Sequence, residues 1–248
     1  MFSVIFEVKR KPDRHDDYIR LAMGLNPILR TIDGFIENER FESQTRPGWL
    51  LSHSAWRDEK SLVRWRTQGN HHAVQEQGRF EIFEDYHLRV GEIVSDTAPP
   101  PGVAVIEQRF DESQIGEATY ATFTEAMPRD DASFAAELRP ADFGLALDAD
   151  GLLEHAIYRS ISAISADTRP YQPGKLALLL SWTTATAATG WTPRPPAGAG
   201  ALRHRAIRVV RDYGMFDRRE APQYYEDVKG PRQTLHPAAA RQTLLQPG

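Results

Sequence analysis

The second half of this chain repeats the first in four blocks that occur in the same order. Residues 33–43 and 150–160 share Asp, Gly, Glu and Ser at equal spacing, and apolar residues coincide at three further positions. A strand-like block ending at Trp56 returns at Trp182, and in each half another tryptophan follows nine residues later. The closing blocks are residues 89–96 and 205–212. The repeat predicts two similar domains in tandem.

The first copy has the periodicities of a split βαβ unit. Residues 2–8 alternate apolar and polar side chains, which predicts a strand. Apolar residues from Tyr18 to Ile32 recur at helical spacing, and Gly34 is expected to end that helix. The remaining predicted elements are strands at 35–43 and 49–56, helices opening at Asp58 and near 71–77, and a strand at 82–94. This order is that of a ferredoxin-like domain.

The predicted domain boundaries follow from composition. Residues 1–96 form the first domain, and the proline-rich residues 97–102 link it to a degenerate second domain at 103–228. Residues 229–248 are expected to be a surface tail. Residues 176–180 are apolar at every position, so both faces of that strand should be covered. We therefore predict an α+β fold in which two ferredoxin-like domains form an intramolecular pseudo-dimer of the dimeric α+β barrel type.

Composition excludes several classes of protein. The net charge of −4 is too small to indicate a nucleic-acid or anionic membrane partner, and no apolar run reaches membrane-spanning length. The chain has no cysteine, which excludes a thiolate nucleophile, and its scattered histidines lack metal-ligand spacing. We expect a cytoplasmic protein without a bound metal, and the sequence leaves open a homo-oligomer of the two-domain chain.

The two copies differ after their second tryptophan. From that residue to the closing strand, the second copy is ten residues shorter and contains Pro193, Pro195 and Pro196. It therefore lacks a counterpart of residues 70–75, because these prolines prevent a regular helix. We expect only the first domain to carry the working pocket.

Several motifs resemble the antibiotic biosynthesis monooxygenase domain. They are the Ile-Asp-Gly-Phe-Ile turn at 32–36, the Ser-x-Trp that ends at Trp56, and the Arg-Trp-Arg segment around Trp65 followed by His71 and His72. The resemblance covers residues 2–96 well and 103–219 more weakly. It implies a pocket between a sheet and its helices. It also implies a cofactor-independent oxygenase that uses dioxygen on a small aromatic substrate, such as a polyphenol, anthrone or quinol.

Two other functions remain open within the same family. One is a non-catalytic module that holds a small ligand in this pocket. The other is a haem-binding or haem-degrading protein, whose relatives use an Asn on the first strand, a Trp on the second helix and a His beyond it. Trp65 matches the tryptophan, whereas residues 2–8 contain no Asn and the His pair is offset. The sequence therefore argues against haem as the working ligand.

The chemistry of an oxygenase suggests candidate site residues in the first copy. His72 or His71 is the candidate base, because a neutral imidazole can accept a proton near pH 7. Trp65 would wall the pocket. Asn38 and Arg40 share one strand face and would steady an anion or carbonyl. The remaining substrate-binding candidate is Trp56.

Each of these candidates also has a structural interpretation. The His pair could begin a solvated helix capped by Asn70. Both Trp56 and Trp65 could be core residues. Arg40 could simply pair with Glu37 or Glu39.

Overall fold

Eight strands form one closed barrel in the computed structural model, which describes residues 1–129, 134, 137–161 and 174–222. The predicted tail at 229–248 lies outside these residues. The first half contains β1 (Phe2–Arg10), α1 (His15–Leu29), β2 (Phe35–Ser43), β3 (Trp49–Trp56), α2 (Glu59–Arg66), α3 (Gly69–Gln77), a π-helical turn (Gly78–Ile82) and β4 (Phe83–Asp96). The second half contains β5 (Tyr120–Pro128), a 3₁₀ turn (Pro140–Phe143), β6 (Leu152–Ser160), β7 (Leu176–Trp182), α4 (Ala185–Gly190) and β8 (Ala199–Gly214).

The two halves are arranged alike. The strand order is β2-β3-β1-β4 in the first half and β6-β7-β5-β8 in the second, and the halves join at both edges through the antiparallel pairs β2–β6 and β4–β8. Arg89 lies opposite Asp212, and Arg205 lies opposite Asp96, so the β4–β8 seam is the same from either half. The predicted α+β fold of the dimeric barrel type is confirmed.

The all-apolar strand β7 has both faces covered, as predicted. Ala177 and Leu179 belong to a core cluster inside the barrel, together with residues of the first half such as Phe41 and Leu51. The alternate residues of β7 pack outside the barrel in a second cluster built from the second half. The halves therefore share one interior, since each sheet closes the other's apolar face.

The repeated Asp-Gly turns serve the same purpose in both halves. Gly34 and Gly151 have φ angles of 84° and 74°, the left-handed region that favours glycine. A Cβ on Gly34 would lie 2.0 Å from Oγ of Ser61 in α2, and one on Gly151 would lie 2.7 Å from Cβ of Ala187 in α4. Glycine is needed because the turn before β2 or β6 packs directly on the following helix.

Helix α1 ends earlier than its apolar pattern predicts. It finishes at Leu29, and Arg30 caps it in a right-handed conformation, so Gly34 is not its stop signal. Thr31 and Ile32 instead donate their backbone amides to the carbonyls of Ile28 and Leu29 in tighter turns. Ile32 still packs in the core beside α1, which explains the longer apolar pattern.

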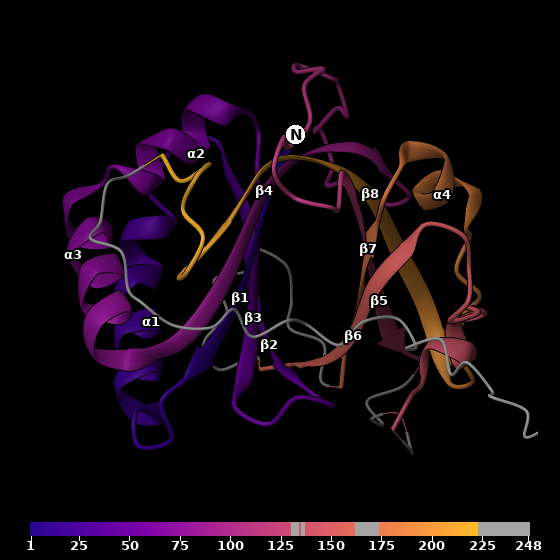
Figure 1. Cartoon of the computed structure of the whole chain (residues 1–248), viewed down its shortest axis with the longest axis horizontal. Helices are drawn as coiled ribbons and strands as arrows, with labels where there is room; N and C mark the ends of the chain where they lie inside the picture. Colours follow the sequence, from indigo (N-terminus) through magenta and orange to yellow (C-terminus); the bar gives the residue numbers. More distant parts are fainter. Residues whose placement is uncertain (130–133, 135–136, 162–173, 223–248) are drawn as a thin grey trace, which may run out of the picture.

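The helices are distributed unequally over the barrel. Figure 1 shows α1, α2 and α3 on the outer face of the first-half strands and α4 on the opposite side of the molecule. Residues 191–198 contain no helix, as the prolines predicted. None of the helices in the described part of the chain has the length and apolar character needed to cross a membrane.

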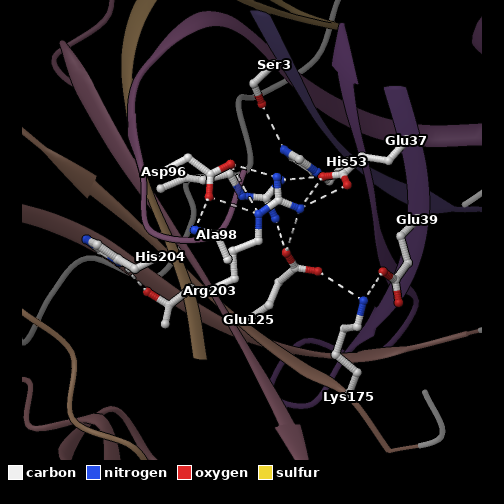
Figure 2. Close-up of polar contacts among 12 residues, drawn as sticks. Ser3, Glu37, Glu39, His53, Asp96, Ala98, Glu125, Lys175, Arg203 and His204 are labelled. Atoms are coloured by element: carbon white, nitrogen blue, oxygen red, sulfur yellow. Dashed lines mark hydrogen bonds and ion pairs between the residues drawn. The ribbon is translucent and has the colours of Figure 1, made fainter. Parts of the chain in front are cut away.

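The barrel interior also holds a network of buried charges, which the sequence did not predict. Figure 2 shows Arg203 between Glu37 and Asp96, at 2.9 and 2.7 Å. Lys175 joins Glu39 and Glu125 at 2.6 and 3.1 Å. Glu37 and Glu39 therefore pair with cations of the second half. The alternative in which they neutralise Arg40 is wrong, because Arg40 lines the opposite, outer face of β2.

Candidate active site

A cavity of about 200 Å³ lies between the outer face of the first-half strands and the helices α1, α2 and α3. We call it the outer cavity. Most of its wall is apolar, and helix α1 contributes five side chains to it: Tyr18, Leu21, Ala22, Leu25 and Leu29. Roughly 300–1,000 Å³ is typical of sites that hold drug-sized ligands. The outer cavity is therefore suited to a smaller molecule.

Strand register sets the composition of the cavity floor. Residues that lie opposite one another on five neighbouring strands form two rows, and all ten line the cavity. The rows are Asn38, Ser54, Val4, Val90 and Arg211, and Arg40, Ser52, Phe6, Leu88 and Tyr213. The floor is therefore polar on β2 and β3, which we call the β2 margin, and apolar on β1 and β4. On β8 the floor carries the cationic Arg211 and the phenolic Tyr213, and we call this side the β8 margin.

Helix α3 presents one histidine of the His pair to the cavity. Its N-cap is Gln68, whose side chain accepts a 2.8 Å hydrogen bond from the backbone amide of His71, so Asn70 is not the cap. His71 lines the outer cavity. His72 is exposed and is not among the lining residues, because adjacent residues of a helix point about 100° apart.

The ring of His71 is held by Trp65. The two rings stack with centroids 4.0 Å apart and an interplanar angle of 14°. Nδ1 of His71 lies 2.8 Å from the carbonyl oxygen of Trp65. Because a carbonyl can only accept, Nδ1 carries the proton, and Nε2 carries a lone pair that lies 3.5 Å from Nε2 of Gln75. Burial, with a smaller contribution from the charge of Arg40, lowers the pKa of His71 to about 4 against the hydrogen bond to the Trp65 carbonyl, so the imidazole is neutral at pH 7.

Asn38 and Arg40 both line the cavity, which settles which face of β2 looks into it. Nδ2 of Asn38 lies 3.0 Å from Oγ of Ser52 and 3.0 Å from the carbonyl oxygen of His53. Arg40 is buried, and its Nη1 donates to Oδ1 of Asn26 at 3.2 Å. Burial lowers the pKa of the Arg40 guanidinium, but a guanidinium keeps its charge in proteins.

The two tryptophans differ in their position relative to the cavity. Trp65 lines the cavity and also stacks on Trp56, with centroids 6.4 Å apart. Trp56 is fully buried below it, and its Nε1 donates to Oγ of Ser54 at 3.0 Å. Trp56 is not among the lining residues, but it contacts Trp65 and Ser54, which both line the cavity.

The second half supplies part of the wall, which the sequence did not indicate. Arg211 and Tyr213 come from β8, and Arg218 follows it. Arg218 donates to the hydroxyl of Tyr86 at 2.5 Å, and Arg79 donates to the same oxygen at 2.9 Å. Arg211 and Tyr213 are two residues apart and so share one face of β8. This pattern places them at the cavity only once the register of β8 with β4 is known.

The corresponding place over the second-half strands is filled by side chains. Phe143, Leu145, Trp182 and Ala188 pack there, all at most 3% exposed, with Trp191 at their margin. Among the residues that the structure describes, the outer cavity lies over the first half, in line with the expected asymmetry, although both halves line it.

Comparison with known proteins places this fold and site in a family. Residues 1–77 match the model of the antibiotic biosynthesis monooxygenase family. Jasmonate monooxygenase ABM of Pyricularia oryzae is 40% identical over 228 residues, which are 91% of this chain and 98% of that protein. The chain belongs to the antibiotic biosynthesis monooxygenase family.

One solved structure supports the fold alone. An aldoxime dehydratase in complex with butyraldoxime is 13% identical and matches with a TM-score of 0.54, covering 84% of this chain and 79% of its own. An anthrone oxidase-like protein is 14% identical with a TM-score of 0.34, covering 90% and 96%.

Proposed function

We propose that this protein is a monooxygenase that transfers one atom of dioxygen to a small, largely apolar molecule bound in the outer cavity. The observation that carries the proposal is the neutral His71, which lines this cavity with Nε2 as an acceptor while Trp65 fixes its ring. Family membership and the 40% identical monooxygenase support the same reaction class.

An aromatic substrate with an activated CH₂ group fits a reaction that needs no added reductant. His71 Nε2 takes a proton from the substrate, and the resulting anion passes an electron to dioxygen. Recombination gives a peroxide, which loses water and leaves a carbonyl, so that CH₂ and O₂ become C=O and H₂O. The positive charge of Arg40 stabilises the oxyanion, and the apolar centre of the floor keeps water from the intermediates.

Jasmonate is the second candidate substrate. It is favoured by the relative, which is named for this compound and matches over 98% of its length. As a carboxylate it would place its charge at the β8 margin, near Arg211. Hydroxylation of an unactivated carbon consumes two further electrons, so this candidate requires an external reductant, whereas the activated aromatic does not.

Isotope incorporation tests the proposal. The purified protein is incubated under ¹⁸O₂ with anthrone or with jasmonate, each with and without NADPH, and the products are analysed by mass spectrometry. We expect one ¹⁸O atom in the product of one substrate, at a rate that His71→Ala lowers. Equal incorporation with and without protein for both compounds would refute the proposal.

The haem alternative is tested with the same preparation. Titration with haem should give no stoichiometric Soret band, and reductant should cause no haem loss. Tight binding followed by bleaching of that band would favour the haem-degrading function instead.

A further inference from the structure

The chain continues beyond β8 into a segment that covers one side of the outer cavity. We call residues 216–222, which follow Met215, the strap. Figure 1 shows this part of the chain, in yellow, on the side of the molecule that carries α1, α2 and α3. Arg218 and Pro222 line the outer cavity, and Pro222 is also exposed to solvent. The strap therefore lies between the cavity and solvent, although it belongs to the second half.

The strap is attached to the barrel at Met215. The amide of Met215 donates to the carbonyl oxygen of Tyr86 at 3.0 Å, and its carbonyl accepts from Nη2 of Arg79 at 3.3 Å. Beyond Met215, the backbone–backbone hydrogen bonds of the strap reach only Gly214 and other strap residues within the part of the chain that the structure describes. Moving the strap therefore breaks no hydrogen bond between strands, and Met215 is the fixed end about which it can turn.

The side chain of Glu220 holds the strap in place. Its carboxylate accepts hydrogen bonds from Oγ of Ser113 at 2.9 Å and from the backbone amides of Gln114 and Asp212 at 2.7 and 2.6 Å. These donors are fixed, since Asp212 is part of β8 and the amide of Ser113 donates to the Val209 carbonyl at 2.7 Å. Hydrogen bonds to an ionised acceptor are stronger than those between neutral groups. Glu220 is therefore a clasp that joins the strap to the second half.

The remaining walls of the cavity are held more firmly. The floor belongs to a closed barrel, and α1 buries four side chains. Helix α3 buries no side chain of its own, which makes it the competing movable wall. It is nevertheless held at both ends, because Gln68 caps its start and the turn that follows it buries Arg79 and Ile82. Beyond Met215, the strap by contrast is joined to the barrel through side chains such as Glu220.

We propose that the strap is a gate of the outer cavity, which Glu220 holds closed and which turns about Met215 when a ligand enters or leaves. Loops that close over a bound molecule commonly set how fast ligands exchange. Glu220 is not among the lining residues, so it acts on this rate rather than on contacts with the ligand. The closed strap places Arg218 in the cavity wall, where Nη1 donates to the hydroxyl of Tyr86 at 2.5 Å. The proposal rests on the proposed function only in taking the outer cavity to be the site where the ligand binds.

The rate at which a thiol in the cavity is modified tests the gate without any ligand. The chain contains no cysteine, so Ala22→Cys introduces a single reporter at a buried, cavity-lining position of α1. Its reaction with a small aromatic disulfide, dithiodipyridine, is followed by absorbance. We expect Glu220→Ala to raise this rate about ten-fold or more, since a hydrogen bond to a charged group accounts for at least that factor.

A reporter in a filled core separates movement of the strap from unfolding. Ala188 is fully buried in the core of the second half, so a thiol introduced there by Ala188→Cys reacts only when that core unfolds. This rate should be lower and should rise steeply with urea. Opening of the strap exposes little surface, so the rate at Ala22→Cys should be nearly independent of urea below the unfolding transition.

Further substitutions in the Ala22→Cys protein assign the effect to the clasp. Glu112→Ala is the matched control, because Glu112 is also acidic and precedes Ser113 but is exposed. Gln68→Ala removes the cap of α3 and tests the competing wall. Both should leave the rate within about two-fold. Glu220→Gln keeps the size of the side chain and weakens the clasp by removing its charge, so a smaller increase in rate remains measurable if Glu220→Ala fails to fold.

An unchanged rate at Ala22→Cys in both Glu220 variants would overturn the proposal. A rate that rises with urea as steeply as that of Ala188→Cys would also overturn it. Acceleration by Gln68→Ala but not by Glu220→Ala would make α3 the gate instead. If the gate is found but no ¹⁸O is incorporated, the monooxygenase proposal fails while the gate stands. Incorporation with an unchanged thiol rate gives the opposite result.

Discussion

Arg89 and Arg205 occupy equivalent places in the two closing strands, and each reaches a glutamate on the first strand of its own half. Arg89 lies 2.5 Å from Glu7, and Arg205 binds Glu125 together with Glu37, the latter at 2.7 Å. Both arginines are at most 1% exposed. The duplication therefore extends to a buried ion pair on each side of the shared interior.

Removing one member of either pair should destabilise the barrel. We expect Arg89→Met to lower the free energy of unfolding by about 3–5 kcal/mol, because it leaves the Glu7 carboxylate buried with less compensation. Urea titration at pH 7 measures the change. The double variant Glu7→Gln, Arg89→Met should recover part of the loss, since both charges are then gone. A single-variant loss below about 1 kcal/mol would contradict this account.

Acid should weaken the fold partly through His53. Burial lowers the pKa of His53 to about 3, and the charge of Arg205 acts in the same direction, whereas the unfolded chain has a pKa near 6.5. The unfolded state therefore binds more protons below pH 6.5, and stability falls as the pH drops toward 3. At pH 5 the contribution of His53 is about 2 kcal/mol.

Comparison with His53→Gln isolates this contribution. The variant should lose about 2 kcal/mol less than the intact chain between pH 7 and pH 5, as measured by urea unfolding. His71 and His204, whose pKa values are both lowered to about 4, act alike in both proteins and cancel in the difference. The Glu7 carboxyl, with a pKa lowered to about 2 by Arg46 and Arg89 against its burial, acts only below pH 4.5. Equal losses in the two proteins would show that His53 is protonated without penalty.

The two adjacent histidines should differ sharply in their effect on oxygenation. His71→Ala is expected to lower kcat/KM by about 100-fold or more, the usual contribution of a general base. His72→Ala should stay within about two-fold, because the side chain is exposed and is not among the lining residues. The rate of the intact enzyme should change little through His71 ionisation between pH 6 and 8, and should fall as pH drops through about 4. The reverse order of effects in the two variants would reassign the base.

The first half alone should associate with itself. A fragment of residues 1–96 exposes the interior face of its four strands and the edges of β2 and β4, which a soluble monomer tolerates poorly. A second copy can replace β6 and β8, so we expect a homodimer by light scattering. A soluble monomer that binds no hydrophobic dye would contradict the shared interior.

The repeated blocks predicted most of the fold because they lie on equivalent strands and turns. The interior charges were not predictable in the same way. Glu37 and Glu39 alternate with Asn38 and Arg40 on β2, and an alternating charged strand indicates a solvated face. Here the charged face turns inward, since the second half supplies Lys175, Arg203 and Arg205 as partners.

The sequence names candidate site residues, but their positions relative to the cavity depend on details of the fold. The sequence places His71 and His72 together, and only the helix start at Gly69 decides which one faces the cavity. Asn38 was predicted to bind the substrate and lines the cavity, but the orientation of its amide depends on a hydrogen bond to the His53 carbonyl across the strand pair. Arg211 and Tyr213 lie more than a hundred residues away, and only the β4–β8 register brings them to the floor.

The β4–β8 seam has a consequence for how such a site can change over generations. In a barrel made of two identical chains, a substitution on the closing strand appears twice, once at each seam position. Here Arg211 lines the cavity, while its counterpart in β4, Ser95, pairs with Ala206 and is not among the lining residues. A residue that contacts the ligand can therefore be substituted in one half without changing the equivalent residue of the other half. Joining two copies in one polypeptide doubles the number of positions around one cavity on which selection can act independently.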